Sequence, residues 1–534
     1  FKKRRMRVTR WLLALLALRG GAAMRCAVLF RGRSRDTFGF LPLGESESFQ
    51  LGETGSSESF QLPHDELRSR LCGASLTPVH GGDATLVWVD GANSVDVAYA
   101  CRRCVLTHAS FDVLATGQTA ADAYERALQQ RGPALKRLLE VNGCEVLDVS
   151  MPRYLSADER SLLLSGIHAA ARRFDAGETL LERADDDHHE PRPDFELRDD
   201  FNPEEWKAAL ESRRGTNGWF DDGVCAGEGW VLLKDRFGAF HVALRTAAGP
   251  AAAQWGLAPA LSGKRRNFKG VLSKLALKRR ASATAVTLEP ELCLVMASLA
   301  RVGVGSRVLD PCCGSAGILL CCATLGGSVS GFDVEDTAFP AAHTEFACFG
   351  LPAPNLFKGD VLGLDAPGAA EYDCIVCDPP YGILAEARVD AEACREHVDV
   401  QAPPVDVQAA PELAFDPKAQ RVKQADSDGR AAAAADRDSL FAVALLDLAA
   451  RRLKPGGRLV FFMPVRGAPA DAAARSVAAA ASVDAVLAHA TDLVLIVKRL
   501  QLFSPTFARW LVCVEKAHLP GSRTRGIGDK ADLK

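Results

Sequence analysis

The chain of 534 residues lacks a strong charge of either sign and any apolar run long enough to cross a bilayer. Its formal net charge of −3 gives no global nucleic-acid signature, so RNA affinity has to come from local clusters of its 64 Lys and Arg residues. The apolar run at residues 11–18 is too short to span a membrane, and no later segment is long enough. A hydrophobic content of 48% supplies packed cores, and the length predicts two to four globular domains.

A paired zinc-finger motif is also missing, although the chain has 16 cysteines. They are scattered along the chain and many lie within apolar stretches, which is typical of reduced core residues. The one CxxC, at residues 101–104, has no second pair and falls in a helical pattern. The Asp, His and Glu run at 185–190 is flanked by prolines and is predicted to be a solvated loop. We therefore predict no metal site.

The N-terminus combines basic residues 2–5, the short apolar run and small residues 20–23, as a secretory signal does. Met24 opens a plausible first strand. We interpret residues 1–23 as translated upstream sequence and expect a cytoplasmic protein. An organellar or secretory leader is the alternative.

The N-terminal half mixes short helical and strand patterns, which predicts an α+β region of one or two small domains. Predicted elements are a strand at 85–89, a helix at 95–106 capped by Ser94, helices at 120–130 and 157–173, and a hairpin of 229–233 with 239–244. A hexapeptide at 46–51 recurs at 57–62, which we interpret as a local insertion in a loop.

From residue 287 the pattern alternates between strand and helix, which predicts an α/β fold with a doubly wound, mostly parallel sheet. Helices are predicted at 289–300, 317–325, 338–349 and 439–453, and strands at 307–309, 328–332, 355–358, 372–377 and 458–463. Runs at 493–497 and 508–514 close the sheet as an antiparallel pair. Residues 390–436 are rich in alanine, proline and acids and are predicted to be a flexible insertion.

The motif Asp378-Pro379-Pro380-Tyr381 directly follows a predicted strand. Alone it would most often be an ordinary turn, but here it follows a strand, turn and helix pattern with acidic strand ends. An exocyclic amine of a nucleobase is a poor nucleophile, and a carboxylate with a neighbouring prolyl carbonyl can hold its two N–H groups. Tyr381 offers a ring on which a flipped base can stack. These four residues are the predicted catalytic site.

A second motif, at residues 314–317, follows a strand and opens a helix, so its backbone N–H groups suit an anionic or polar ligand. A dinucleotide is the rival ligand, but the G-x-G-x-x-G register is absent. Three strand-end acids suit the parts of S-adenosylmethionine: Asp310 the methionyl cation, Asp333 the ribose hydroxyls and Asp360 the adenine amine. The predicted cofactor contacts are Asp310, Gly314, Ser315, Gly317, Asp333 and Asp360.

Basic residues cluster just before this fold, without an acid among them. A solvated helical face is the alternative interpretation, but the position would let phosphate contacts aim a long RNA at the site. The predicted RNA contacts are Lys264, Arg265, Arg266, Lys269, Lys278, Arg279 and Arg280.

Together these motifs resemble the THUMP-containing tRNA methyltransferases that make N2-methylguanosine at position 10 of tRNA. The most specific segments are 277–280, the motif at 314–317, 378–382 and the run at 502–511. The resemblance implies a Rossmann-like class I methyltransferase domain at 287–518, preceded by a THUMP-like RNA-binding region at 24–245 and a basic linker at 246–286. It also implies that Asp378 holds the guanine amine, and that a small zinc-binding partner protein activates the enzyme.

One departure from this family's pattern is Ala316, which replaces a usual glycine and would cost on the order of 1 kcal/mol in a left-handed conformation. Two rival functions stay open from the sequence. One is an N6-adenine methyltransferase acting on DNA or RNA, since the same tetrapeptide serves that amine. The other is an inactive RNA-binding module. The tail at 519–534 carries no prediction.

Overall fold

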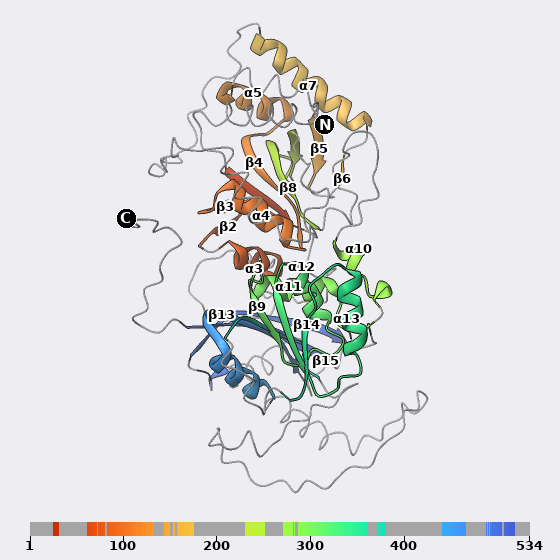
Figure 1. Ribbon diagram of the computed structural model, residues 1–534. Helices are drawn as coiled ribbons and strands as arrows, with labels where there is room; N and C mark the ends of the chain where they lie inside the picture. The colour runs from red at the N-terminus through yellow and green to blue at the C-terminus, as the bar shows by residue number, and fades with distance from the viewer. Residues whose placement is uncertain are drawn as a thin grey trace, which may run out of the picture.

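The computed structural model contains two β-sheets, one in each half of the chain (Figure 1). The residues that the structure describes are 25–30, 61–131 without 72, 81 and 82, 144–149, 153–154, 157–175, 230–250 without 236, 271–360 without 281 and 284–286, 371–380, 441–465, and 487–517 without 489, 491, 505 and 506. The segments 1–23, 46–51, 185–190, 390–436 and 519–534 lie outside the described residues.

The N-terminal sheet has eight strands in the order β2-β3-β1-β4-β8-β7-β5-β6. Its strands are β1 (Arg25–Phe30), β2 (Ser75–His80), β3 (Asp83–Asp90), β4 (Thr107–Gly117), β5 (Cys144–Asp148), β6 (Arg153–Tyr154), β7 (Trp230–Lys234) and β8 (Phe240–Ala248). All neighbours pair antiparallel except β5 and β7, which are parallel. The predicted hairpin is confirmed as β7 and β8.

Helices α4 (Ser94–Arg103), α5 (Ala120–Arg131) and α7 (Ala157–Asp175) accompany this sheet. The cap of α4 is Asn93, whose side chain accepts from the Asp96 amide at 2.9 Å. Ser94, the predicted cap, lies inside the helix and donates its hydroxyl to Asp112 at 2.8 Å. Asn93, which precedes Ser94, forms the cap because its backbone is extended, as the residue before the first helical residue usually is.

The C-terminal sheet has seven strands in the order β11-β10-β9-β12-β13-β15-β14. Its strands are β9 (Arg307–Asp310), β10 (Ser328–Asp333), β11 (Asn355–Lys358), β12 (Tyr372–Cys377), β13 (Leu453–Val465), β14 (Leu493–Ser504) and β15 (Phe507–Lys516). The first five pair in parallel, whereas β15 runs antiparallel to both β13 and β14. The predicted doubly wound, mostly parallel sheet with an antiparallel closing pair is therefore confirmed.

Both faces of this sheet are buried. Successive residues on a strand point to opposite sides, so each strand contributes side chains to two different hydrophobic cores. On β12, Cys374 and Val376 join a core with α11 (Pro290–Leu299), α12 (Gly317–Thr324) and α13 (Phe339–Cys348). Ile375 and Cys377 join the opposite core, with the helical residues 441–452. Strand β13 begins at 453 rather than at the predicted 458, since Leu453 already pairs with Tyr372.

Helix α3 (Gln61–Arg70) lies between the two sheets in Figure 1 and packs on α11. Leu62 belongs to the same hydrophobic core as α11, so this part of the second hexapeptide copy is helical rather than in a loop. Arg70 donates to the Val302 carbonyl at 3.0 Å, and Arg499 pairs with Asp65 at 2.7 Å. These contacts attach the N-terminal region directly to the C-terminal sheet.

Short elements α10 (Val271–Leu275) and η3 (Leu277–Arg279) precede α11. Across the described ranges, no helix has both the length and the apolar character needed to cross a membrane.

Candidate active site

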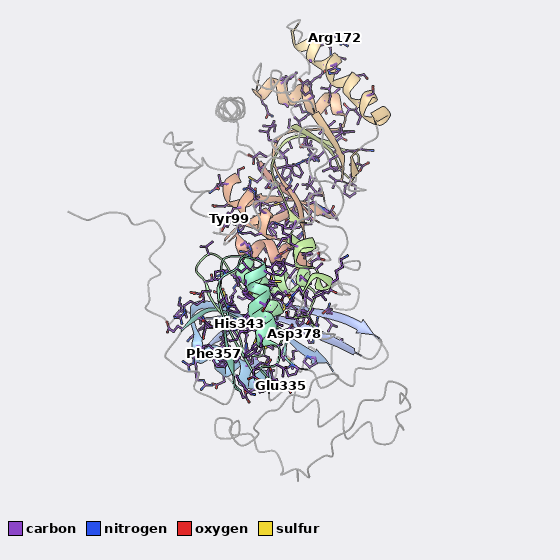
Figure 2. The ribbon with its side chains drawn as sticks, turned by 45° about the vertical axis from the view of Figure 1, so that its right-hand side comes forward. Tyr99, Arg172, Glu335, His343, Phe357 and Asp378 are labelled. Carbon is purple, nitrogen blue, oxygen red and sulfur yellow. The ribbon has the colours of Figure 1, made fainter. Side chains whose placement is uncertain are left out.

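Four predicted acids lie at the carboxyl ends of the adjacent strands β11, β10, β9 and β12. Asp310 ends β9, Asp333 ends β10, Asp360 follows β11 and Asp378 directly follows β12. Because these strands are parallel, the four carboxylates share one edge of the sheet. Figure 2 shows Asp378 in the half of the molecule that holds this sheet. Ligands of open α/β sheets bind at this edge.

These acids also interact electrostatically. Burial raises the pKa of Asp310 well above its ordinary value, and the charges of Asp333 and Asp378 raise it further. A hydrogen bond with Cys377 lowers the pKa of Cys312, but burial and the charges of Asp310, Asp333 and Asp360 outweigh it and raise that pKa. Each acid therefore acts on the electrostatics of the same small region.

The cofactor loop, residues 311–316, is fastened to the end of β10. The Cys313 amide donates to the Phe332 carbonyl at 2.8 Å, and the Gly314 amide donates to Asp333 Oδ2 at 2.7 Å. Gly314 has a φ of 48° and is exposed, and a Cβ built on it would meet nothing within 4 Å. The loop thus presents open space beside strand-end carboxylates, a setting that suits a polar ligand with hydroxyl and cationic groups.

Asp333 is already used by the backbone, since Oδ1 accepts from the Glu335 amide at 3.0 Å and Oδ2 from Gly314. A carboxylate has about four lone-pair sites, so these two bonds orient Asp333 and still leave it acceptor capacity. The Asp310 carboxylate is buried and accepts from the Cys312 amide at 3.1 Å.

Ala316 does adopt the left-handed conformation expected from its position. Its φ is 57° and its ψ is 30°, it caps α12, and its side chain is fully buried in the core. The strain expected at this residue is therefore present in the fold, at a position where a glycine would have none.

The buried ion pair of Arg280 and Glu345 contacts the cofactor loop. Arg280 Nη2 donates to Glu345 Oε2 at 3.0 Å and to the Ser315 carbonyl at 3.2 Å, and Ser282 donates to the same two residues. A Cβ on Gly317 would lie 2.9 Å from Arg280 Nη1, so the guanidinium packs against the start of α12. The expectation that Arg280 contacts RNA is therefore corrected: its side chain is 1% exposed and supports the loop.

The rest of the predicted RNA cluster is only partly described. Lys278 is exposed, and Arg279 belongs to η3 although its side chain is outside the described set. Lys264, Arg265, Arg266 and Lys269 lie outside the described residues.

At the catalytic motif, Asp378 is half-buried, Pro379 is buried and Pro380 is half-buried, whereas Tyr381 lies outside the described residues. Arg509 on β15 donates from Nη1 to Asp378 Oδ1 at 3.2 Å. Sequence reasoning did not single out this arginine as a site residue. The signal was available, since Arg509 lies within the 502–511 run that carries part of the family resemblance.

The structure describes the side chains of twelve cysteines, and none of these twelve is in a disulfide; ten of them are buried. Within the described ranges, no group of three or more His, Cys, Asp or Glu side chains is arranged to hold a metal ion.

Comparisons with known proteins find a family model that matches part of this half of the chain, and several similar proteins. Residues 278–393 match the UPF0020 family model, described as RMKL-like, methyltransferase domain. The chain is 34% identical over 101 residues to a tRNA (guanine(10)-N2)-dimethyltransferase of Methanothermobacter thermautotrophicus, covering 18% of this chain and 29% of that protein.

Two eukaryotic tRNA (guanine(10)-N(2))-methyltransferases are also similar. The protein of Schizosaccharomyces pombe is 27% identical over 195 residues, 35% of this chain and 37% of that protein. The protein of Dictyostelium discoideum is 31% identical over 202 residues, 36% of this chain and 35% of that protein. The chain thus spans about a third of the length of the curated relatives it matches. On these findings, residues 278–393 are similar to an RMKL-like methyltransferase domain.

Proposed function

We propose that this chain is an S-adenosylmethionine-dependent tRNA methyltransferase that makes N2-methylguanosine at position 10 of tRNA. The observation that carries the proposal is Asp378, which follows β12 beside Asp310 and next to the cofactor loop on the shared sheet edge. The names of the similar proteins support guanine N2 as the target and tRNA as the substrate.

The chemistry of Asp378 suits an exocyclic amine. The lone pair of such an amine is delocalised into the base, so the nitrogen needs acceptors that favour a pyramidal geometry. The Asp378 carboxylate accepts from one N–H and takes up the proton that the nitrogen loses, and the Pro379 carbonyl accepts from the other N–H. The prolines fix φ and keep this loop rigid, and Tyr381 provides a stacking surface for the flipped base.

The residues around the loop fit the methyl donor that a methyltransferase domain uses. S-adenosylmethionine supplies an electrophilic methyl group on a sulfonium sulfur. Asp310 would hold its cationic methionyl part, and Asp333 its ribose hydroxyls. Asp360 would accept from the adenine amine. Gly314, Ser315 and Gly317 would let the backbone approach the ligand closely, and the open space beside Gly314 is consistent with that role.

The N-terminal region, residues 24–245, would grip the tRNA body as a THUMP-like module, and the linker 246–286 would guide the RNA. Lys278 is the described member of the basic cluster that is exposed for a phosphate contact. A small zinc-binding activator protein is the further partner that we propose, on the resemblance to the eukaryotic enzymes.

The test is an assay of the full chain with labelled methyl donor and tRNA, with and without a candidate activator, followed by identification of the methylated nucleoside. N2-methylguanosine is the expected product. Recovery of only N6-methyladenosine would refute the proposed base. Absence of S-adenosylhomocysteine binding by calorimetry, even with the activator, would support the inactive module.

Asp378→Ala is the first variant to assay. We expect turnover to fall by a factor of about 10² or more, because the amine loses its main acceptor. The tRNA dissociation constant should change little, since phosphate contacts supply most of the affinity. Wild-type turnover in a folded variant would contradict the role of Asp378.

A further inference from the structure

Arg509 is a buried arginine that is held on three sides. Its Nη1 donates to Asp378 Oδ1 at 3.2 Å, and its Nε donates to Gln501 Oε1 at 2.7 Å. Its guanidinium carbon lies 3.6 Å from the centroid of the Phe462 ring. The Arg509 side chain is 4% exposed and that of Asp378 is 17% exposed, so little solvent screens this ion pair.

The register of the sheet explains how these groups meet. Arg509 on β15 stands opposite Gln501 on β14 and opposite Pro464 on β13. Phe462 lies two residues before Pro464 and therefore on the same face, at the diagonal position that an arginine can cover. The antiparallel strands β14 and β15 thus place the Arg509 guanidinium at the end of β12, next to Asp378.

The Arg509–Asp378 ion pair lies at the carboxylate edge of the sheet, unlike the Lys454–Asp373 pair. Lys454 pairs with Asp373 at 2.6 Å at the opposite end of β12, away from the carboxylate edge. At the edge itself, Asp378 shares its surroundings with the carboxylate of Asp310. A neighbouring carboxylate disfavours ionisation of Asp378, whereas a guanidinium in contact with its carboxylate favours ionisation.

We propose that Arg509 is a positioning residue for methyl transfer. Its guanidinium fixes the orientation of the Asp378 carboxylate and keeps it ionised, which is the form that accepts from the substrate amine. Gln501 and Phe462 fix the guanidinium in turn. This inference rests on the proposed function, because it assigns Arg509 a role through Asp378.

The test compares the full-length wild type with Arg509→Met, Arg509→Lys and, as a matched control, Lys454→Met, which removes the ion pair at the other end of β12. We measure kcat and KM for tRNA methylation, together with the stoichiometry and Kd of S-adenosylhomocysteine by calorimetry. The binding stoichiometry gives the fraction of protein molecules that bind S-adenosylhomocysteine, so kcat can be expressed per binding site. A variant that is partly unfolded can then still be compared with the wild type.

Arg509→Met should lower kcat by a factor of about 10², a loss comparable to that of one preorganised hydrogen-bond donor. KM and the S-adenosylhomocysteine Kd should stay within about threefold of wild type. Arg509→Lys keeps the charge but loses the planar fork, so its kcat should fall between those of wild type and Arg509→Met. Lys454→Met should keep the wild-type kcat.

Wild-type kcat per binding site in Arg509→Met would overturn the inference, as would an equal loss in Lys454→Met. If Arg509→Met does not fold, Arg509→Lys decides: an unchanged kcat overturns the positioning role, and a reduced kcat with unchanged KM supports it. A wild type that makes no N2-methylguanosine, with or without the activator, refutes the proposed function itself. The two failures are therefore distinguishable.

Discussion

At the scale of single residues, Arg280 and Lys278 show how neighbours in one basic cluster take different roles. Lys278 is exposed, whereas Arg280 is buried against Glu345 and the Ser315 carbonyl. The sequence does not distinguish the two basic residues. They differ because the Arg280 side chain packs against Glu345 on α13 and Gly317 at the start of α12. A basic cluster predicts a charged surface on average without saying which member faces inward.

The exchange Arg280→Met should destabilise the fold by about 3 to 5 kcal/mol, because it leaves the Glu345 carboxylate buried without its cation. Chemical unfolding followed by circular dichroism measures this loss. The tRNA affinity of the folded fraction should be unchanged.

Lys278→Met is the matched control, with the opposite expected pattern. Its stability should stay within about 0.5 kcal/mol of wild type, since the side chain is exposed. Its tRNA affinity should fall, with the slope of log K against log salt reduced by about 1. If Arg280→Met lowered the tRNA affinity but left the unfolding free energy unchanged, Arg280 would be an RNA contact after all.

At the scale of elements, the cofactor loop and β10 meet at a glycine. A Cβ on Gly331 would lie 2.7 Å from a Leu319 methyl carbon and 2.8 Å from the Cβ and Sγ of Cys313. Real Cβ contacts are essentially never this short, so a side chain here would push the loop and α12 away from the sheet. The φ of Gly331 is not in the left-handed region, so its backbone conformation does not require a glycine. The close approach of Leu319 and Cys313 does.

Gly331→Ala is therefore expected to cost about 1 to 3 kcal/mol of stability by overpacking. It should also weaken S-adenosylhomocysteine binding, because Cys313 is fastened to the end of β10 next to Gly314. Thermal unfolding and calorimetric titration measure the two effects.

Gly166→Ala on α7 provides the control, because a Cβ there meets the Ala121 methyl at an ordinary 3.7 Å. Helix propensity predicts a stabilisation of up to about 1 kcal/mol and no change in ligand binding. Equal cofactor affinity in Gly331→Ala and wild type would contradict the close packing of β10 against the loop.

At the scale of the whole molecule, α3 joins the two sheets through a largely buried interface. Arg458 on β13 donates to the Ser69 hydroxyl at 3.2 Å, and Arg301 donates to the Ser69 carbonyl at 3.2 Å. Glu66 is fully buried beside them and accepts from the Val105 and Leu106 amides at 2.8 and 3.0 Å. These bonds fix the orientation of the N-terminal sheet relative to the active-site edge.

Burial raises the pKa of Glu66 from 4.5 to about 7, although the amides of Leu106 and Val105 oppose the shift. Between these pH values the folded state holds a proton on Glu66 that the unfolded state has released. The free energy of unfolding therefore falls as pH rises through this window, by about 3 kcal/mol in total. Denaturant unfolding at a series of pH values from 4.5 to 8 measures this dependence.

Glu66→Gln isolates this contribution, because the amide carries no titrating proton. The difference in unfolding free energy between wild type and Glu66→Gln should change by about 3 kcal/mol across the window, in the direction that favours the variant at high pH. A constant difference at every pH would show that Glu66 keeps an ordinary pKa in the folded protein.

The sequence alone determined the features that local chemistry encodes: the alternation of helices and strands from residue 287, the acids at the strand ends, the left-handed Ala316 and the motif after β12. Such features depend on short segments whose periodicity and backbone preferences are visible along the chain. The tertiary structure alone decided the pairings that join distant segments. Arg509 meets Asp378 across 131 positions, and Arg499 meets Asp65 across 434. Strand order and register set these contacts, because they determine which buried charges face each other, and no local pattern records that choice.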